Sequence, residues 1–168
     1  SDKGCESTID KQIIIHSLPS TNFNVVSDIC LGDEVNISYI SDVSVLSWNY
    51  NFGDGYFSDK QNPTHIYDSL AIFDISLEVV SMHGCKNDTV MSSIIETHKY
   101  PIADFQTNKI FASEFLPEII FYNNSQGGMY FEWDFGNGSY SFEENPSHSF
   151  TEPQIYNVIL TATSDIGC

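Results

Sequence analysis

Asp54 has the clearest capacity for chemistry in this sequence, because its carboxyl group lies between two glycines in the run Asn51–Gly55. Ca²⁺ accepts carboxylate ligands from such loops, but it needs several oxygens, so Asp59 or Asp68 would also have to lie nearby. A structured turn is the simpler interpretation, because glycine adopts positive φ freely and an aspartate beside it can bond to its own backbone. We predict this turn and no resident metal or cofactor, with calcium as the alternative.

His65 and His148 are candidates for metal ligands or acid–base groups. Each lies two residues after a proline, in a loop that leads into a predicted strand. Either role would need a second histidine or a cysteine at ligand spacing, and the sequence supplies none. We therefore predict structural imidazoles, with Tyr67 acting like the tyrosine that pins a corner of a β-sandwich. Phe150 replaces this tyrosine near His148 and cannot donate the same bond.

Catalytic motifs are absent from the sequence. It contains no His-Glu-x-x-His zinc motif, no Gly-x-Ser-x-Gly turn and no P-loop, and no alternation directs two carboxylates at one cleft. The 23 acidic residues against 6 basic ones give a net charge of -17, which repels nucleic acid and anionic membranes. No apolar run approaches the roughly 20 residues of a membrane-spanning helix. We predict that the chain is not an enzyme and binds neither nucleic acid nor membrane.

The four cysteines indicate a disulfide framework of a secreted protein, since no Cys-x-x-Cys redox motif is present. Cys30 opens one predicted strand, and Cys85 lies in the turn after another strand of the same module. We predict a disulfide between them, which would close a loop of about 55 residues and stabilise the fold by about 4 kcal/mol. Cys5 and Cys168 have no partner within their own modules.

These residues belong to a sequence that repeats itself. The segments Asn51–Gly55 and Asn62–Tyr67 return 83 residues later, and the two copies align without a gap up to Cys85 and Cys168. The ending Ser81–Cys85 also matches Ser1–Cys5. The predicted organisation is the terminal strand of a preceding repeat at 1–18, a complete module at 19–99, and a module lacking its last strand at 100–168.

Apolar and polar residues alternate along each copy, as in Phe73, Ile75, Leu77 and Val79, and this period is that of a β-strand. Several short strands separated by glycine, asparagine, aspartate and proline predict an all-β fold of tandem immunoglobulin-like β-sandwiches. The predicted core contains Trp48, Tyr50, Phe52, Ile75 and Leu77 in the first module and Trp133, Phe135, Val158 and Leu160 in the second.

The repeated pattern resembles tandem PKD domains, a family named for the polycystic kidney disease protein. The resemblance rests on aromatic-x-aromatic-x-Phe-Gly-Asp-Gly, then Asn-Pro-x-His-x-Tyr, then an alternating strand that ends in Gly-Cys. The residues that carry it are Trp48, Phe52, Gly53, Asp54, Gly55, Pro63, His65 and Tyr67 in the first copy, and Phe135, Gly136, Asn137, Gly138, Pro146, His148 and Phe150 in the second. The second copy departs from the family pattern at Asn137 and Phe150.

The Gly-Cys ending and the acidic composition further resemble PKD arrays in giant secreted surface proteins of Bacteroidota, including gliding-motility adhesins exported by the type IX secretion system. This resemblance implies an extracellular, cell-surface spacer or adhesive module. Its partners would be neighbouring repeats and a surface polysaccharide or another surface protein. The alternative is an accessory module of a secreted polysaccharide- or protein-degrading enzyme, whose exposed aromatic rings stack on the substrate.

Two further predictions concern modification and assembly. Ser69 and Thr89 lie in short sequences that resemble the Asp-Ser/Thr-aliphatic acceptor motif for O-glycans in Bacteroidota. The incomplete repeats at the two ends would leave a free strand and an unpaired sheet edge. An isolated chain would then self-associate by strand exchange, unless the chain is an excised segment of a longer filament, which we favour.

Overall fold

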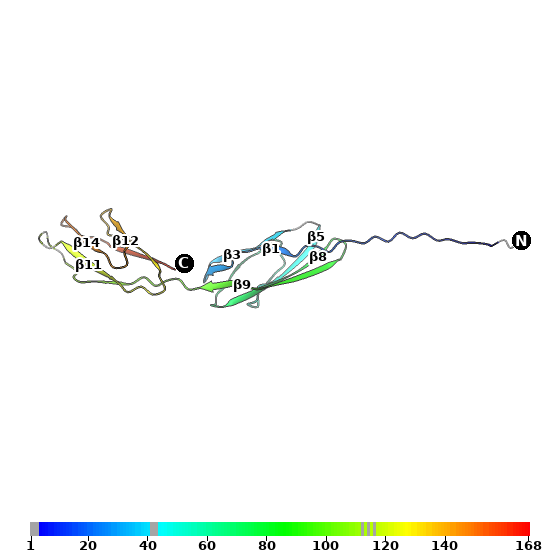
Figure 1. The fold of residues 1–168 in the computed structure, drawn as a ribbon, viewed down its shortest axis with the longest axis horizontal. Helices are drawn as coiled ribbons and strands as arrows, with labels where there is room; N and C mark the ends of the chain where they lie inside the picture. Colours follow the sequence, from blue (N-terminus) through cyan, green and yellow to red (C-terminus); the bar gives the residue numbers. More distant parts are fainter. Residues whose placement is uncertain (1–3, 41–43, 112, 114, 116) are drawn as a thin grey trace.

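The computed structural model describes residues 4–40, 44–111, 113, 115 and 117–168. Two β-sandwich modules lie end to end, and the extended N-terminal segment runs away from the first module (Figure 1). The C-terminal residues return to the junction between the modules. Ser1 to Lys3, part of the predicted strand of a preceding repeat, lie outside the described residues, and residues 4–18 form no strand.

The described residues of the first module form nine strands. They are β1 (Asn22–Asn24), β2 (Asp28–Cys30), β3 (Glu34–Asn36), β4 (Ser38–Ile40), β5 (Val45–Asn51), β6 (Phe57–Ser58), β7 (Thr64–Ile66), β8 (Ile72–Ser81) and β9 (Lys86–His98). One sheet has the strand order β2-β9-β8-β5-β6, and the pairs β1-β4 and β3-β7 supply the opposite layer. β2 runs parallel to β9, whereas the other pairs are antiparallel.

Alternation of apolar and polar residues from Phe73 to Val79 determines which face of β8 enters the core. Ile75 and Leu77 are fully buried, whereas Asp74 and Glu78 point outward. The predicted core residues Tyr50 and Phe52 are also buried, and Trp48 is half-buried against the same cluster.

The described residues of the second module form six strands. They are β10 (Phe105–Thr107), β11 (Glu118–Asn123), β12 (Tyr130–Asp134), β13 (Tyr140–Ser141), β14 (Ser147–Ser149) and β15 (Ile159–Thr163). They form two three-stranded sheets with the orders β10-β11-β14 and β13-β12-β15. Trp133, Phe135 and Leu160 are buried, and Val158 is half-buried beside them.

These observations confirm the predicted all-β fold of tandem immunoglobulin-like sandwiches. The burial of Tyr50 and Trp133 also confirms the predicted strand register, because a slip by one residue would have turned both side chains outward.

Candidate functional site

The turn that follows β5 binds its own backbone through Asp54. Oδ1 of Asp54 accepts a hydrogen bond from the Tyr56 backbone N–H at 3.1 Å, and Asn51 Oδ1 accepts one from Gly53 N–H at 3.0 Å. Gly53 has φ 85° and Gly55 has φ 95°, values that favour glycine. The second carboxylate oxygen accepts a 2.6 Å hydrogen bond from Nε2 of His65, which lies on β7. One carboxylate oxygen therefore stabilises the turn, and the other connects the turn to β7.

His65 connects this turn to the aromatic core. Its ring stacks on Phe52 with centroids 4.2 Å apart and meets Tyr67 edge-on at 4.6 Å. The hydroxyl of Tyr67, which is fully buried, donates to the Phe52 carbonyl at 3.1 Å. Tyr67 thus ties the end of β7, which it directly follows, to the end of β5, in the way expected of a corner tyrosine.

The second copy keeps this cluster without its carboxylate. Oδ1 of Asn137 accepts from Ser139 N–H at 3.1 Å, and its Nδ2 group donates to Nε2 of His148 at 3.0 Å. His148 stacks on Phe135 at 4.1 Å, and burial lowers the pKa of His148. Phe150 is buried but has no hydroxyl group. A cluster that survives the loss of the carboxylate and of the tyrosine hydroxyl favours a structural role for both copies.

The calcium alternative requires Asp59 or Asp68 beside Asp54. Among the described residues, one cluster brings three potential metal-ligand side chains together, and it consists of Asp28, Glu96 and His98. Asp54 does not belong to this cluster.

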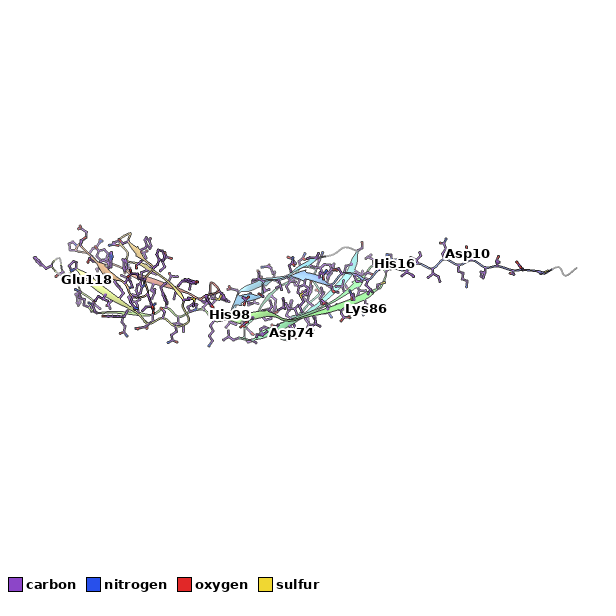
Figure 2. The ribbon with its side chains drawn as sticks, viewed as in Figure 1. Asp10, His16, Asp74, Lys86, His98 and Glu118 are labelled. Atoms are coloured by element: carbon purple, nitrogen blue, oxygen red, sulfur yellow. A yellow bond between two sulfur atoms is a disulfide. The ribbon has the colours of Figure 1, made fainter. Side chains whose placement is uncertain are left out.

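The predicted disulfide between Cys30 and Cys85 is wrong. Cys30 is bonded to Cys168, 138 residues further along the chain, and Cys85 is a free thiol. The reason is the length of β9, whose 13 residues span roughly 40 Å. Cys85 precedes the start of β9, near Lys86 at one end of the module, and Cys30 pairs with His98 at its other end (Figure 2).

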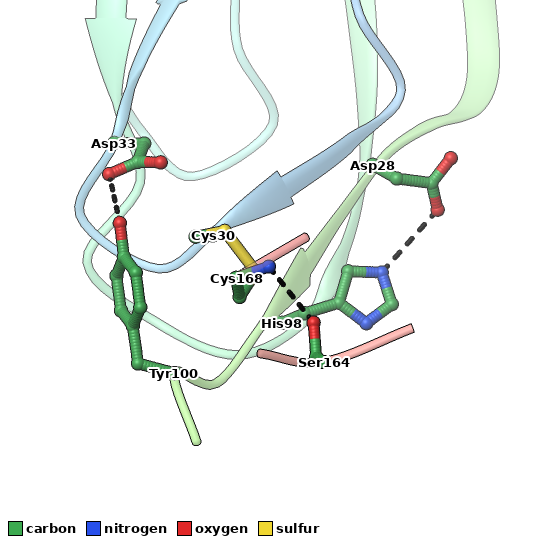
Figure 3. The surroundings of a disulfide bond; sticks show 7 residues. All are labelled: Asp28, Cys30, Asp33, His98, Tyr100, Ser164 and Cys168. Atoms are coloured by element: carbon green, nitrogen blue, oxygen red, sulfur yellow. Dashed lines mark hydrogen bonds and ion pairs between the residues drawn. A yellow bond between two sulfur atoms is a disulfide. The ribbon is translucent and has the colours of Figure 1, made fainter. Parts of the chain in front are cut away.

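The disulfide joins the two modules at their junction (Figure 3). The backbone N–H of Leu31 donates to the His98 carbonyl at 2.8 Å, and the Cys168 N–H donates to Ser164 Oγ at 2.9 Å. The Tyr100 hydroxyl donates to Asp33 Oδ1 at 2.6 Å, and this bond raises the pKa of Tyr100. The repeat equivalence of Cys85 and Cys168 was visible in the sequence, but it did not reveal that this cysteine reaches a neighbouring module.

An open apolar groove lies on one side of the second module. Its volume is about 830 Å³, and its lining includes Phe105, Ile110, Phe111, Phe115, Tyr156 and Val158. Tyr156 and Val158 occupy the repeat positions of Phe73 and Ile75, which pair with β9 in the first module and are buried there. The groove is therefore on the side where β9 covers the first core.

The two predicted glycan acceptors differ in solvent exposure. Ser69 is exposed in the loop before β8, where its carbonyl accepts a 2.9 Å hydrogen bond from Thr97 Oγ1. Thr89 is half-buried on β9. Both sites stay predictions, and the intact mass of native protein tests them.

Buried tyrosines predict that alkaline pH destabilises the first module more than the second. Burial, with a smaller contribution from Tyr39, raises the pKa of Tyr50 from 10.0 to about 12, and burial together with the charge of Asp54 raises the pKa of Tyr67 as well. Because both folded-state pKa values lie above the unfolded value, this stability is present below pH 10 and is lost as pH rises. Each group would remove about 1.4 kcal/mol per pH unit between pH 10 and 12. The repeat equivalents of these tyrosines are Trp133 and Phe150, which do not titrate.

Urea unfolding at pH 8 to 11 under reducing conditions measures this effect. Trp48 and Trp133 report the first and second module separately, so Trp48→Phe isolates the second module. Tyr50→Phe and Tyr67→Phe are expected to remove the pH dependence of the unfolding free energy of the first module. An equal loss of stability in both modules would contradict the assignment.

A family model described as the PKD domain matches residues 17–95 and 98–168. The crystal structure of the PKD1 domain of Vibrio anguillarum Epp is 26% identical, with 49% of this chain and 98% of that chain covered and a TM-score of 0.42. Fibronectin(III)-like modules of Clostridium thermocellum CbhA match at 10% identity over 86% of each chain, with a TM-score of 0.50, which supports the fold alone. Among the described residues, no helix has the length and apolar character to cross a membrane.

Proposed function

Because the chain belongs to the PKD domain family through its two matched segments, we propose that it is a structural or adhesive repeat module of a long secreted cell-surface protein. PKD domains are non-catalytic modules that are typically extracellular. The observation that carries the proposal is the end-to-end stacking of two modules joined by the Cys30–Cys168 disulfide. A covalent bond across a junction limits the relative motion of the modules, as an extended spacer requires.

We further propose that the parent protein is a gliding-motility adhesin of Bacteroidota that the type IX secretion system exports. Tandem repeats, the recurring Gly-Cys ending and a net charge of -17 support it, since like-charged modules repel one another and stay separate in solution. Neighbouring repeats are its first partners, and a surface polysaccharide or another surface protein is the adhesive target.

Labelling of intact cells tests this function. Antibodies raised against the chain are expected to bind the surface of unbroken cells that make it, and deletion of the parent gene is expected to reduce attachment. Labelling that requires cell lysis would contradict the proposal.

We also propose the domain limits 19–99 and 100–168, with the second module completed by a strand equivalent to β9. The apolar groove beside Tyr156 and Val158 supports this proposal. Sedimentation of the 168-residue chain tests whether copies supply that strand to one another through the exposed segment around Ile13. We expect a monomer, and oligomers that disappear on deletion of residues 1–18 would indicate strand exchange instead.

A patch of exposed rings on the second module favours the alternative function, an accessory module that binds substrate for a secreted degradative enzyme. Tyr130 and Phe142 are exposed and, with Met129, Phe131 and Glu144, line a cavity of about 240 Å³. Aromatic faces stack well on the apolar faces of other rings, including sugars.

Affinity electrophoresis in gels containing soluble polysaccharides tests the alternative. If the patch binds a polysaccharide, that polysaccharide will slow the migration of the wild-type chain, and Tyr130→Ala and Phe142→Ala will each abolish this effect. Phe57→Ala, which removes an exposed ring from the first module, will not. Equal effects of all three substitutions would argue against the patch as a binding site.

A further inference from the structure

Three ligand-type side chains gather at the junction end of the first module. Asp28 on β2 lies opposite Glu96 on the parallel strand β9, and His98 follows two residues after Glu96. Residues in register across paired strands, and residues two apart along one strand, share a face of the sheet. One ligand atom from each of the three side chains lies within 4.8 Å of the other two.

The Nε2 atom of His98 is buried and makes no hydrogen bond. Its contact in this group is an ion pair with Oδ1 of Asp28 at 3.4 Å, drawn as a dashed line in Figure 3. A buried polar atom that makes no hydrogen bond costs about 1 to 3 kcal/mol, and a water molecule or an ion at this position would remove that cost.

Asp28 is prepared to act as a ligand. The Ser27 hydroxyl donates to its Oδ2 atom at 2.7 Å, and its Oδ1 atom lies 3.4 Å from Nε2 of His98, so the two side chains are already close. The carboxylates of Asp28 and Glu96 are exposed, so an ion can enter from solvent and both side chains can rotate.

We propose that Asp28, Glu96 and His98 bind a divalent transition-metal ion of the zinc type. One imidazole nitrogen and two carboxylate oxygens form a donor set that Zn²⁺ accepts, with water as a fourth ligand. Zinc–ligand bonds of about 2.0 to 2.2 Å place tetrahedral ligand atoms about 3.4 Å apart, which small rotations of the exposed carboxylates achieve. Ca²⁺ and Mg²⁺ prefer all-oxygen sites and are expected to bind more weakly.

At this position a bound ion would stabilise the pairing of β2 with β9. His98 pairs with Cys30 in the β2–β9 ladder, and its carbonyl accepts the hydrogen bond from Leu31. An ion held between Asp28 and His98 therefore fixes the end of β2, which carries Cys30 of the inter-module disulfide, to the end of β9. The proposal does not depend on whether the array is adhesive or serves an enzyme.

Titration calorimetry of the oxidised 168-residue chain with ZnCl₂ tests the site. We expect one dominant Zn²⁺ per chain, with little heat from CaCl₂ or MgCl₂ at equal concentration. Removal of a group that merely supports a metal ligand costs about 10- to 100-fold in affinity, so His98→Ala should cost at least as much. Asp28→Asn and Glu96→Gln should also weaken binding, and they keep the test valid if His98→Ala fails to fold.

Two matched variants control for metal bound elsewhere on this acidic surface. Glu78→Gln removes an acid on the outer face of the same sheet, and His16→Ala disrupts the stacked pair of His16 and His83 at the other end of the module. Neither should change the zinc affinity by more than about twofold, well below the effect of losing a ligand. Undiminished binding in Asp28→Asn, Glu96→Gln and His98→Ala, or binding lost only in His16→Ala, would overturn the proposal.

Discussion

Replacement of Cys30 and Cys168 by serine is expected to lower the free energy of unfolding by about 5 kcal/mol, because the disulfide closes a loop across 138 residues of sequence. By the same chain-entropy model, the bond stabilises by about 1 kcal/mol more than the predicted bond within one module would. It also joins two modules that have separate hydrophobic cores, so its removal should let the modules unfold in two transitions. Urea unfolding with and without reductant measures both effects.

Cys85→Ser supplies the matched control for the disulfide. Cys85 is a half-buried thiol, so its replacement should change stability by about 1 kcal/mol or less. Peptide mapping of the oxidised protein should recover a fragment that joins Cys30 to Cys168. Recovery of Cys30 joined to Cys85, or equal destabilisation by all cysteine replacements, would contradict the structure.

Gly53→Ala is expected to destabilise the first module by about 4 kcal/mol, from two causes that act together. At φ 85° an alanine is strained by about 1 to 3 kcal/mol. Its Cβ atom would also lie 2.5 Å from the carbonyl oxygen of Asp74, on the central strand β8. Overpacking against backbone that cannot move adds about 1 to 3 kcal/mol.

Gly55→Ala separates the two causes. Gly55 has φ 95°, but a Cβ atom there meets nothing within 4 Å, so only the strain of about 1 to 3 kcal/mol applies. The second module offers the same comparison, since a Cβ at Gly136 would lie 2.5 Å from the Asn157 carbonyl oxygen and one at Gly138 would meet nothing. Equal unfolding midpoints for the two members of either pair would refute the close-contact argument.

The core and the turn motif could be predicted from sequence because both depend on residues close together in the chain. Alternation places Ile75 and Leu77 on one face whatever the partner strand is. The Asp54 turn likewise depends on a local hydrogen bond, from the Tyr56 N–H two residues further along the chain. The half-burial of Trp48 and Val158 was not predictable, because it depends on how much of each strand the opposite layer covers.

The disulfide and the zinc-type site depend on contacts that local patterns do not contain. Asp28 and Glu96 meet only because β2 pairs in parallel with the far end of β9, and no nearby turn specifies that register. Cys168 meets Cys30 only because the second module stacks on this same end of the first. The prediction that Cys30 and Cys85 lie at one end of the module was wrong, because β9 separates them along its whole length.

Under tension, the Cys30–Cys168 bond changes which part of the chain bears load. A pull applied between Ser1 and Cys168 passes across the two sulfur atoms, so residues 31–167 lie outside the loaded path. Complete extension would then release only the first 30 residues, a contour length of about 100 Å, compared with about 570 Å for the reduced chain. The oxidised pair of modules therefore lengthens little under force. Reduction of this one bond lets both modules unfold and extend the chain.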